Sequence, residues 1–162
     1  MRNKKDYKRV NWVEGMDLTF NLLQQTEDHF TAAICDMQSI LLNKNNFGLL
    51  PSADGKTDSS EFDISERVTG MVEIRLRRCN AVTSGGCRIN YNPPQGESMS
   101  YSHSFETDTQ QHTGTASWDV ILTVDPFKRI PSGIPNSEDI PPRHPDADMY
   151  YHLSITPKGS LN

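Results

Sequence analysis

The strict alternation of apolar and polar side chains is the feature that most constrains how this chain can fold. Val68, Gly70, Val72, Ile74 and Leu76 alternate with polar residues, which is typical of a strand with one polar face. The same period of two recurs at residues 98–105, 118–124 and 149–156, and shorter strands are predicted at 61–64 and 88–91. No helical segment alternates with these strands. The pattern therefore predicts an antiparallel sandwich or barrel of six or seven strands and disfavours a parallel sheet.

One long amphipathic helix precedes the strands, over residues 21–43. Its apolar stripe recurs every three or four residues, at Leu23, Thr26, Phe30, Ile34, Met37 and Leu41. Thr19 and Asn21 are both suitable N-caps, and the Asn-rich run at 43–46 with Gly48 ends the helix. We expect the stripe to cover an open edge or one end of the sheet, which makes the fold mainly β, of the α+β kind.

The segment before the helix carries an aromatic residue in a short alternating run, residues 8–13. Val10 and Trp12 share one face of a predicted strand, and Gly15 permits a turn. Trp12 and Trp118 are interpreted first as core residues, because buried aromatic rings supply much apolar area. The alternative is an exposed Trp at a partner surface.

Two long polar segments are predicted as loops. Residues 106–116 have no apolar residue before Ala116. Residues 125–148 hold a cluster of prolines, at positions 126, 131, 135, 141, 142 and 145. Prolines favour an extended, pre-organised backbone, and loops of this length are usually functional or partly disordered.

Composition excludes several classes of protein. The net charge of −5 gives a nucleic-acid partner no electrostatic attraction. The first ten residues lack the apolar core of a signal peptide, and no stretch approaches the ~20 apolar residues of a membrane span. Three cysteines, an odd number, fit a reducing compartment. We therefore expect one soluble, cytoplasmic domain over residues 1–162.

No constellation of catalytic or metal-binding residues stands out. None of the five histidines lies three to five residues from another, as a structural zinc pair would. Cys79 and Cys87 flank a loop and are interpreted as free thiols, with a disulfide between them as the alternative. There is no Gly-x-Ser-x-Gly elbow and no phosphate-binding loop. We expect no metal, no cofactor and no enzymatic activity.

The order of several short motifs resembles the N-terminal region of the TssK family, baseplate components of bacterial type VI secretion systems. These motifs are the segment Asn11–Met16 followed by Leu18, the Gln24-Gln25 pair with Phe30, the Gly48-Leu-Leu-Pro turn, and the proline-rich 140–145 running into 150–155. Family members commonly carry Pro and His-Phe before the Gln pair. Here Phe20 to Leu23 stand instead, so the match is to a divergent branch.

The resemblance implies a β-sandwich "shoulder" domain, similar to that of siphophage receptor-binding proteins. Family members are longer and trimeric, with a helical neck and a head that faces the TssJ–TssL–TssM membrane complex. The shoulder docks on the wedge proteins TssF and TssG. By implication this chain is the N-terminal, wedge-facing part of a longer homotrimeric adaptor, at the cytoplasmic side of a membrane-anchored apparatus.

Three apolar residues around the first turn, Trp12, Met16 and Phe20, are the predicted partner-binding residues; the alternative is that all three are core. A competing hypothesis is a receptor- or carbohydrate-binding β-sandwich that uses Tyr91, Tyr101 and Tyr150. A third is a hydrolase that uses His103 with serines of the 98–105 strand.

Overall fold

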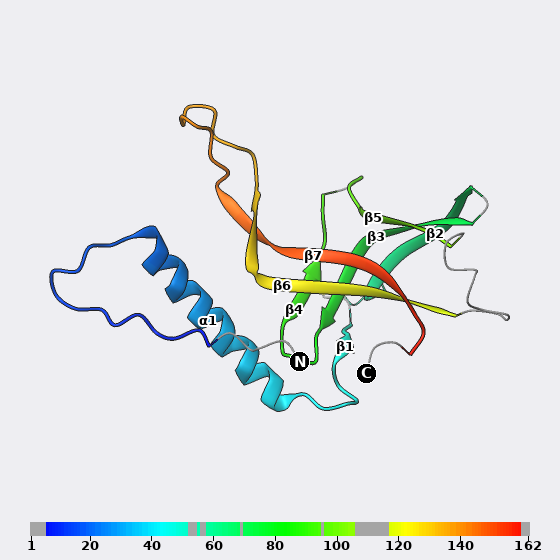
Figure 1. Cartoon of the computed structure of the whole chain (residues 1–162), viewed down its shortest axis with the longest axis horizontal. Coiled ribbons are helices and arrows are strands. Elements are labelled where there is room, and N and C mark those ends of the chain that lie inside the picture. Colours follow the sequence, from blue (N-terminus) through cyan, green and yellow to red (C-terminus); the bar gives the residue numbers. More distant parts are fainter. Residues whose placement is uncertain are drawn as a thin grey trace.

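The computed structural model describes residues 6–51, 55, 58–68, 70–94, 96–105 and 117–159, which form one helix and seven strands (Figure 1). The predicted loop at 106–116 lies outside the described residues. The elements are α1 (Phe20–Leu41), β1 (Gly48–Leu49), β2 (Ser60–Val68), β3 (Met71–Val82), β4 (Arg88–Tyr91), β5 (Met99–Ser104), β6 (Trp118–Ser132) and β7 (Asp146–Pro157). All strand pairs are antiparallel, so the predicted mainly β, α+β class is confirmed.

Strand β3 organises the larger, five-stranded sheet because all four other strands of that sheet pair with it. Its first half is flanked by β2 and β5, and its second half by β1 and β4. Val68 of the predicted strand is instead the last residue of β2, and Gly70 lies in the β2–β3 turn, whereas Val72 to Leu76 do lie in this central strand. One of its faces is buried, and the other carries the charged residues that the alternation had placed there.

A β-bulge at Arg77 explains how both halves of β3 bury apolar residues. Glu61 pairs with Arg78 and Phe62 pairs with Leu76, so Arg77 has no partner in β2. One extra residue reverses the direction of every later side chain. Leu76 before the bulge and Cys79 after it therefore both point into the core, although one number is even and the other odd.

The second layer is a two-stranded ribbon of β6 and β7 that crosses the larger sheet (Figure 1). Leu153 of β7 is buried among Leu76, Cys79, Ala81 and Ile89. Partly buried side chains pack around this core, namely Tyr91, Met99, Tyr101, Leu122, Val124 and Tyr151. Two strands lie over a sheet of five, so a complete sandwich stays a prediction.

The prediction of a single loop over residues 125–148 is wrong. β6 continues to Ser132 and β7 begins at Asp146, so the ribbon extends beyond the sheet as an arm, and residues 133–145 form its tip (Figure 1). Pro126 falls in a bulge between Asp125 and Arg129, where the ladder is interrupted. A ribbon of two strands also has two open edges, where proline costs no ladder hydrogen bond. The prolines are therefore compatible with strands here.

The helix is confirmed, at Phe20–Leu41, and the strand at residues 8–13 is wrong. Thr19 is the N-cap, and its Oγ1 accepts a hydrogen bond of 3.4 Å from the amide of Leu22. At the other end, Asn46 Nδ2 donates to the carbonyl of Leu41. Residues 8–13 pair with no strand of the described chain, and the carbonyls of Tyr7 and Lys8 contact side chains of α1 instead.

Candidate partner-binding surface

The segment before α1 is fixed to the helix through His29. His29 Nδ1 lies 2.7 Å from the carbonyl oxygen of Tyr7, and Arg9 Nε donates to His29 Nε2 at 3.1 Å. Arginine can only donate, so Nε2 is the acceptor and Nδ1 carries the proton that it donates to Tyr7. The neutral imidazole thus joins two points of the N-terminal segment to the helix.

Two further contacts hold the same segment. The Tyr7 ring stacks on Phe127 of β6, with centroids 4.0 Å apart. Gln25 Nε2 donates to the carbonyl of Lys8. A groove of about 440 Å³ lies between this segment and the first turns of α1, and it is lined by polar residues that include Gln24 and Gln25. The Gln pair of the sequence motif therefore lies beside the N-terminal segment.

The three predicted partner-binding residues lie on the surface. Trp12 is 48% exposed, Met16 37% and Phe20 74%. Gly15, with φ of 79°, makes the turn between them, and the amide of Met16 donates to the carbonyl of Val13 at 3.3 Å. The interpretation of Trp12, Met16 and Phe20 as core residues is therefore wrong, because all three side chains are exposed. Their role in binding a partner stays a prediction.

The apolar stripe of α1 also faces outward, which the sequence did not predict. None of the 22 residues of α1 is buried. The exposed side chains of the stripe, here called the apolar helix face, are Leu23, Phe30, Ile34, Met37 and Leu41. A continuous apolar stripe in water marks an interaction surface. The expectation that this stripe packs on the sheet is wrong.

The helix is attached to the sheets by its more polar side instead. Arg129 of β6 donates through Nη2 to Asp28 at 2.8 Å and to Glu27 at 3.0 Å. Further along α1, at Cys35, the backbone of the helix contacts Gly86 in the β3–β4 turn. A Cβ at Gly86 would lie 2.0 Å from the carbonyl oxygen of Cys35. These two contacts set which side of α1 faces the protein.

The three thiols are free, and two of them meet where α1 touches the β3–β4 turn. Cys35 and Cys87 share a hydrogen bond. Burial raises the pKa of the Cys87 thiol from 9.0 to about 12, and the neighbouring Cys35 adds to that rise. Both cysteines therefore stay protonated near neutral pH and pack as small apolar residues.

The residues proposed to bind a carbohydrate or to catalyse hydrolysis are engaged in contacts with other aromatic rings. Tyr91 packs edge-on against Tyr151, and Tyr101 contacts His152, which stacks on Tyr150. His103 contacts both Phe105 and Trp118. Trp118 is thus partly buried but lies outside the core cluster, so its interpretation as a core residue is confirmed only in part. Half-buried packing accounts for these aromatic residues without a bound sugar or a reacting group.

The tip of the arm is a third exposed apolar feature. The amide of Asn136 donates to the carbonyl of Arg143 at 3.0 Å, and Arg143 pairs with Asp139. His144 Nδ1 lies 2.9 Å from the carbonyl of Gly133. This small framework presents Ile134 and Ile140, of which Ile140 is 97% exposed. No pattern of periodicity could have identified two isolated isoleucines as surface residues.

No group of three His, Cys, Asp or Glu side chains within the described ranges is placed to hold a metal ion. None of the helical segments that the structure describes has the length and apolar character needed to cross a membrane. No protein-family model matches the chain, and neither the curated proteins nor the solved structures that were compared include a match.

Proposed function

We propose that this chain is a structural adaptor module of a type VI secretion baseplate, of the TssK shoulder kind, and that it binds wedge proteins without catalysing a reaction. The observation that carries the proposal is the exposure of Trp12, Met16 and Phe20, which lie within and just after the motif that resembles the family. Exposed aromatic and methionine side chains on a fixed segment are typical anchors for a protein partner.

The fixation of that segment supports a binding role. His29, Gln25 and Phe127 hold residues 7–9 in place. The segment has therefore already lost part of its conformational entropy before a partner binds. An apolar segment that is both exposed and tethered loses less entropy on binding than a free tail. The net charge of −5 also favours a protein partner over a nucleic acid.

We also propose an oligomeric state and a cellular location for the protein. In the longer protein, the module belongs to a homotrimer at the cytoplasmic side of a membrane-anchored apparatus. Contacts between copies would cover the apolar helix face, which otherwise stays in water. The neck and head that lead to the membrane complex would follow this chain.

The test is complex formation with purified TssF and TssG-type wedge proteins from the same genome, read by size-exclusion chromatography with light scattering. A stoichiometric complex is expected, and Trp12→Ala with Met16→Ala and Phe20→Ala should abolish it without lowering the melting temperature. The control is Ile134→Ala with Ile140→Ala, which removes apolar groups of the arm that are even more exposed than the three test residues.

Failure of the complex has two distinguishable causes. If a trimerised fusion of the chain binds where the isolated chain does not, the avidity of the trimer is required and the proposal stands. If the folded, trimerised chain also fails to bind, the adaptor function is rejected. Loss of binding in the arm variant alone would support the adaptor function but would place the binding site on the arm.

A further inference from the structure

Strand β2 forms an open edge of the five-stranded sheet. Eight of its nine residues pair with β3 on one side, and no strand within the described part of the chain pairs with them on the other. The strand contains neither proline nor glycine. An edge of this length presents a row of unpaired backbone groups to which another strand can bind.

The apolar face of the sheet continues onto β2 without a cover. Phe62 is 54% exposed and Ile64 57%, whereas their cross-strand partners Leu76 and Ile74 are buried. The core cluster that contains Leu153 of the β6–β7 ribbon includes residues of β3 and β4, with Met99 and Tyr101 of β5 packed against it, but it includes no described residue of β2. A strand added beside β2 would therefore gain apolar contacts as well as backbone hydrogen bonds.

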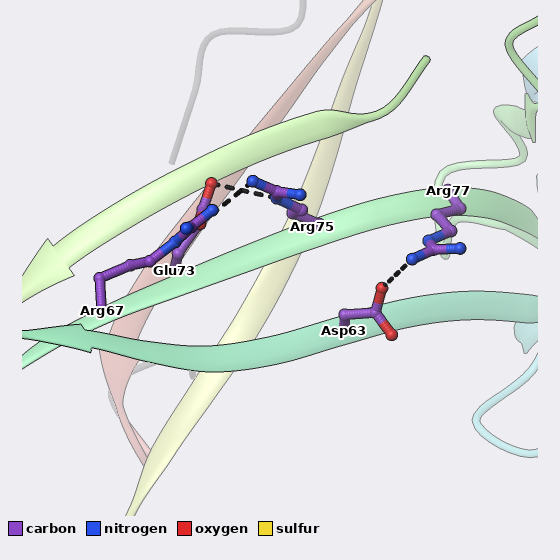
Figure 2. Close-up of polar contacts among 5 residues, drawn as sticks. All are labelled: Asp63, Arg67, Glu73, Arg75 and Arg77. Carbon is purple, nitrogen blue, oxygen red and sulfur yellow. Dashed lines mark hydrogen bonds and ion pairs between the residues drawn. The ribbon is translucent and has the colours of Figure 1, made fainter. Parts of the chain in front are cut away.

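The opposite face of the same edge carries charges of both signs, and its residues on β2 are Glu61 and Asp63, with Arg67 nearer the end of the strand. Figure 2 shows Arg77 of β3 directed at Asp63 of β2, with a distance of 2.5 Å, while Arg67 and Arg75 both point to Glu73. Arg77 and Arg78 of β3 also lie 3.8 Å from Glu61. The carboxylates of Glu61 and Asp63 remain about half exposed, and each can accept further hydrogen bonds.

A second copy of β2 fits this edge poorly. Antiparallel pairing centred on Asp63 sets Asp63 opposite its own copy, and pairing centred on Phe62 sets Glu61 opposite Asp63. Pairing centred on Ile64 or on Ser65 sets an apolar residue opposite Glu66, although it also sets Arg67 opposite Glu61 or Asp63. Like charges directly opposite each other, or an apolar residue opposite a carboxylate, weaken a strand pair. Each of these registers has such a mismatch.

We propose that the free edge of β2 binds an extended segment of another protein in which apolar and basic residues alternate. The apolar residues would cover Phe62 and Ile64, and the basic residues would pair with Glu61 and Asp63. Such strand addition draws affinity from the backbone and specificity from alternate side chains. This site is separate from Trp12, Met16 and Phe20, and it does not depend on the proposed adaptor function.

The test uses a fluorescein-labelled peptide as long as β2, nine residues, of alternating valine and lysine, with binding followed by fluorescence anisotropy. It should bind more tightly than a serine–lysine or a valine–glutamate peptide. Asp63→Lys should weaken its binding about tenfold, because an attractive cross-strand pair becomes a repulsive one. The same variant should gain affinity for the valine–glutamate peptide.

The control is Asp139→Lys, which makes the same change in net charge on the arm, where Asp139 pairs with Arg143. Hydrogen exchange should show new protection of the amides of residues 60–68 when the peptide binds. Equal losses in the two lysine variants would mean that only net charge matters and would overturn the proposal. So would binding that leaves the β2 amides unprotected, or no preference for valine over serine.

Discussion

Arg129 Nη2 lies 2.8 Å from Asp28 Oδ1 and so joins the base of the arm to the first half of α1, across 101 residues of sequence. The Asp28 side chain is only 17% exposed, whereas Glu27, the second partner, is 70% exposed. The Asp28 bond therefore provides most of the attachment, because exposed pairs contribute little.

Replacement of Arg129 should loosen the helix. Arg129→Ala leaves Asp28 without its cation, and we expect the free energy of unfolding to fall by about 1–2 kcal/mol. Urea denaturation followed by circular dichroism measures the change. The control, Arg143→Ala, removes an exposed pair on the arm and should change stability by less than ~0.5 kcal/mol. Equal effects of the two variants would contradict this role for Arg129.

A methyl group at Gly86 should displace α1. The Cβ of Gly86→Ala would lie 2.0 Å from the Cys35 carbonyl, and the residue has φ of +78°. We expect a loss of more than ~2 kcal/mol in stability and faster hydrogen exchange in α1. Gly85→Ala is the matched control, since its nearest neighbour would be 3.9 Å away. If both variants exchange like the wild type, α1 does not rest on this turn.

Alkaline pH should destabilise the protein partly through Cys87. Its folded pKa, about 12, is above the ordinary value of 9.0, so its stabilising contribution is complete below pH 9 and is lost as the pH rises toward 12. Between pH 7 and pH 10, we expect wild type to lose about 1 kcal/mol more than Cys87→Ala loses. Parallel urea titrations at the two pH values measure it. Identical losses would show that Cys87 ionises normally.

The apolar helix face should govern self-association and leave folding unaffected. Because Ile34 is exposed, Ile34→Lys should change the free energy of unfolding by less than ~0.5 kcal/mol. Light scattering over a concentration series should show association of the wild type and a monomer for Ile34→Lys. Lys44→Glu, beyond the end of α1, serves as the control. A wild type that stays monomeric throughout would count against contacts between copies at this face.

Local patterns in the sequence sufficed for most of the elements. Thr19 and the spacing of apolar residues from Leu23 to Leu41 defined α1 to within a few residues, because capping and helical period are local properties. The alternation from Val72 to Leu76 likewise placed β3, and the lack of intervening helices correctly indicated antiparallel pairing. In each case the deciding interactions lie within one or two turns or between neighbouring residues.

Only the tertiary structure decided which surfaces meet. The period of α1 shows that it has an apolar face, but the contacts of Arg129 with Asp28 and of Gly86 with Cys35 turn that face to water. The bulge at Arg77 and the strands within the proline-rich segment depend on pairing partners far along the chain. Residues 8–13 alternate like a strand and yet form none, and the contacts of Tyr7 and Lys8 with α1 hold the segment against the helix instead. Periodicity fixes what a segment can bury, while the long-range partners determine whether it is buried at all.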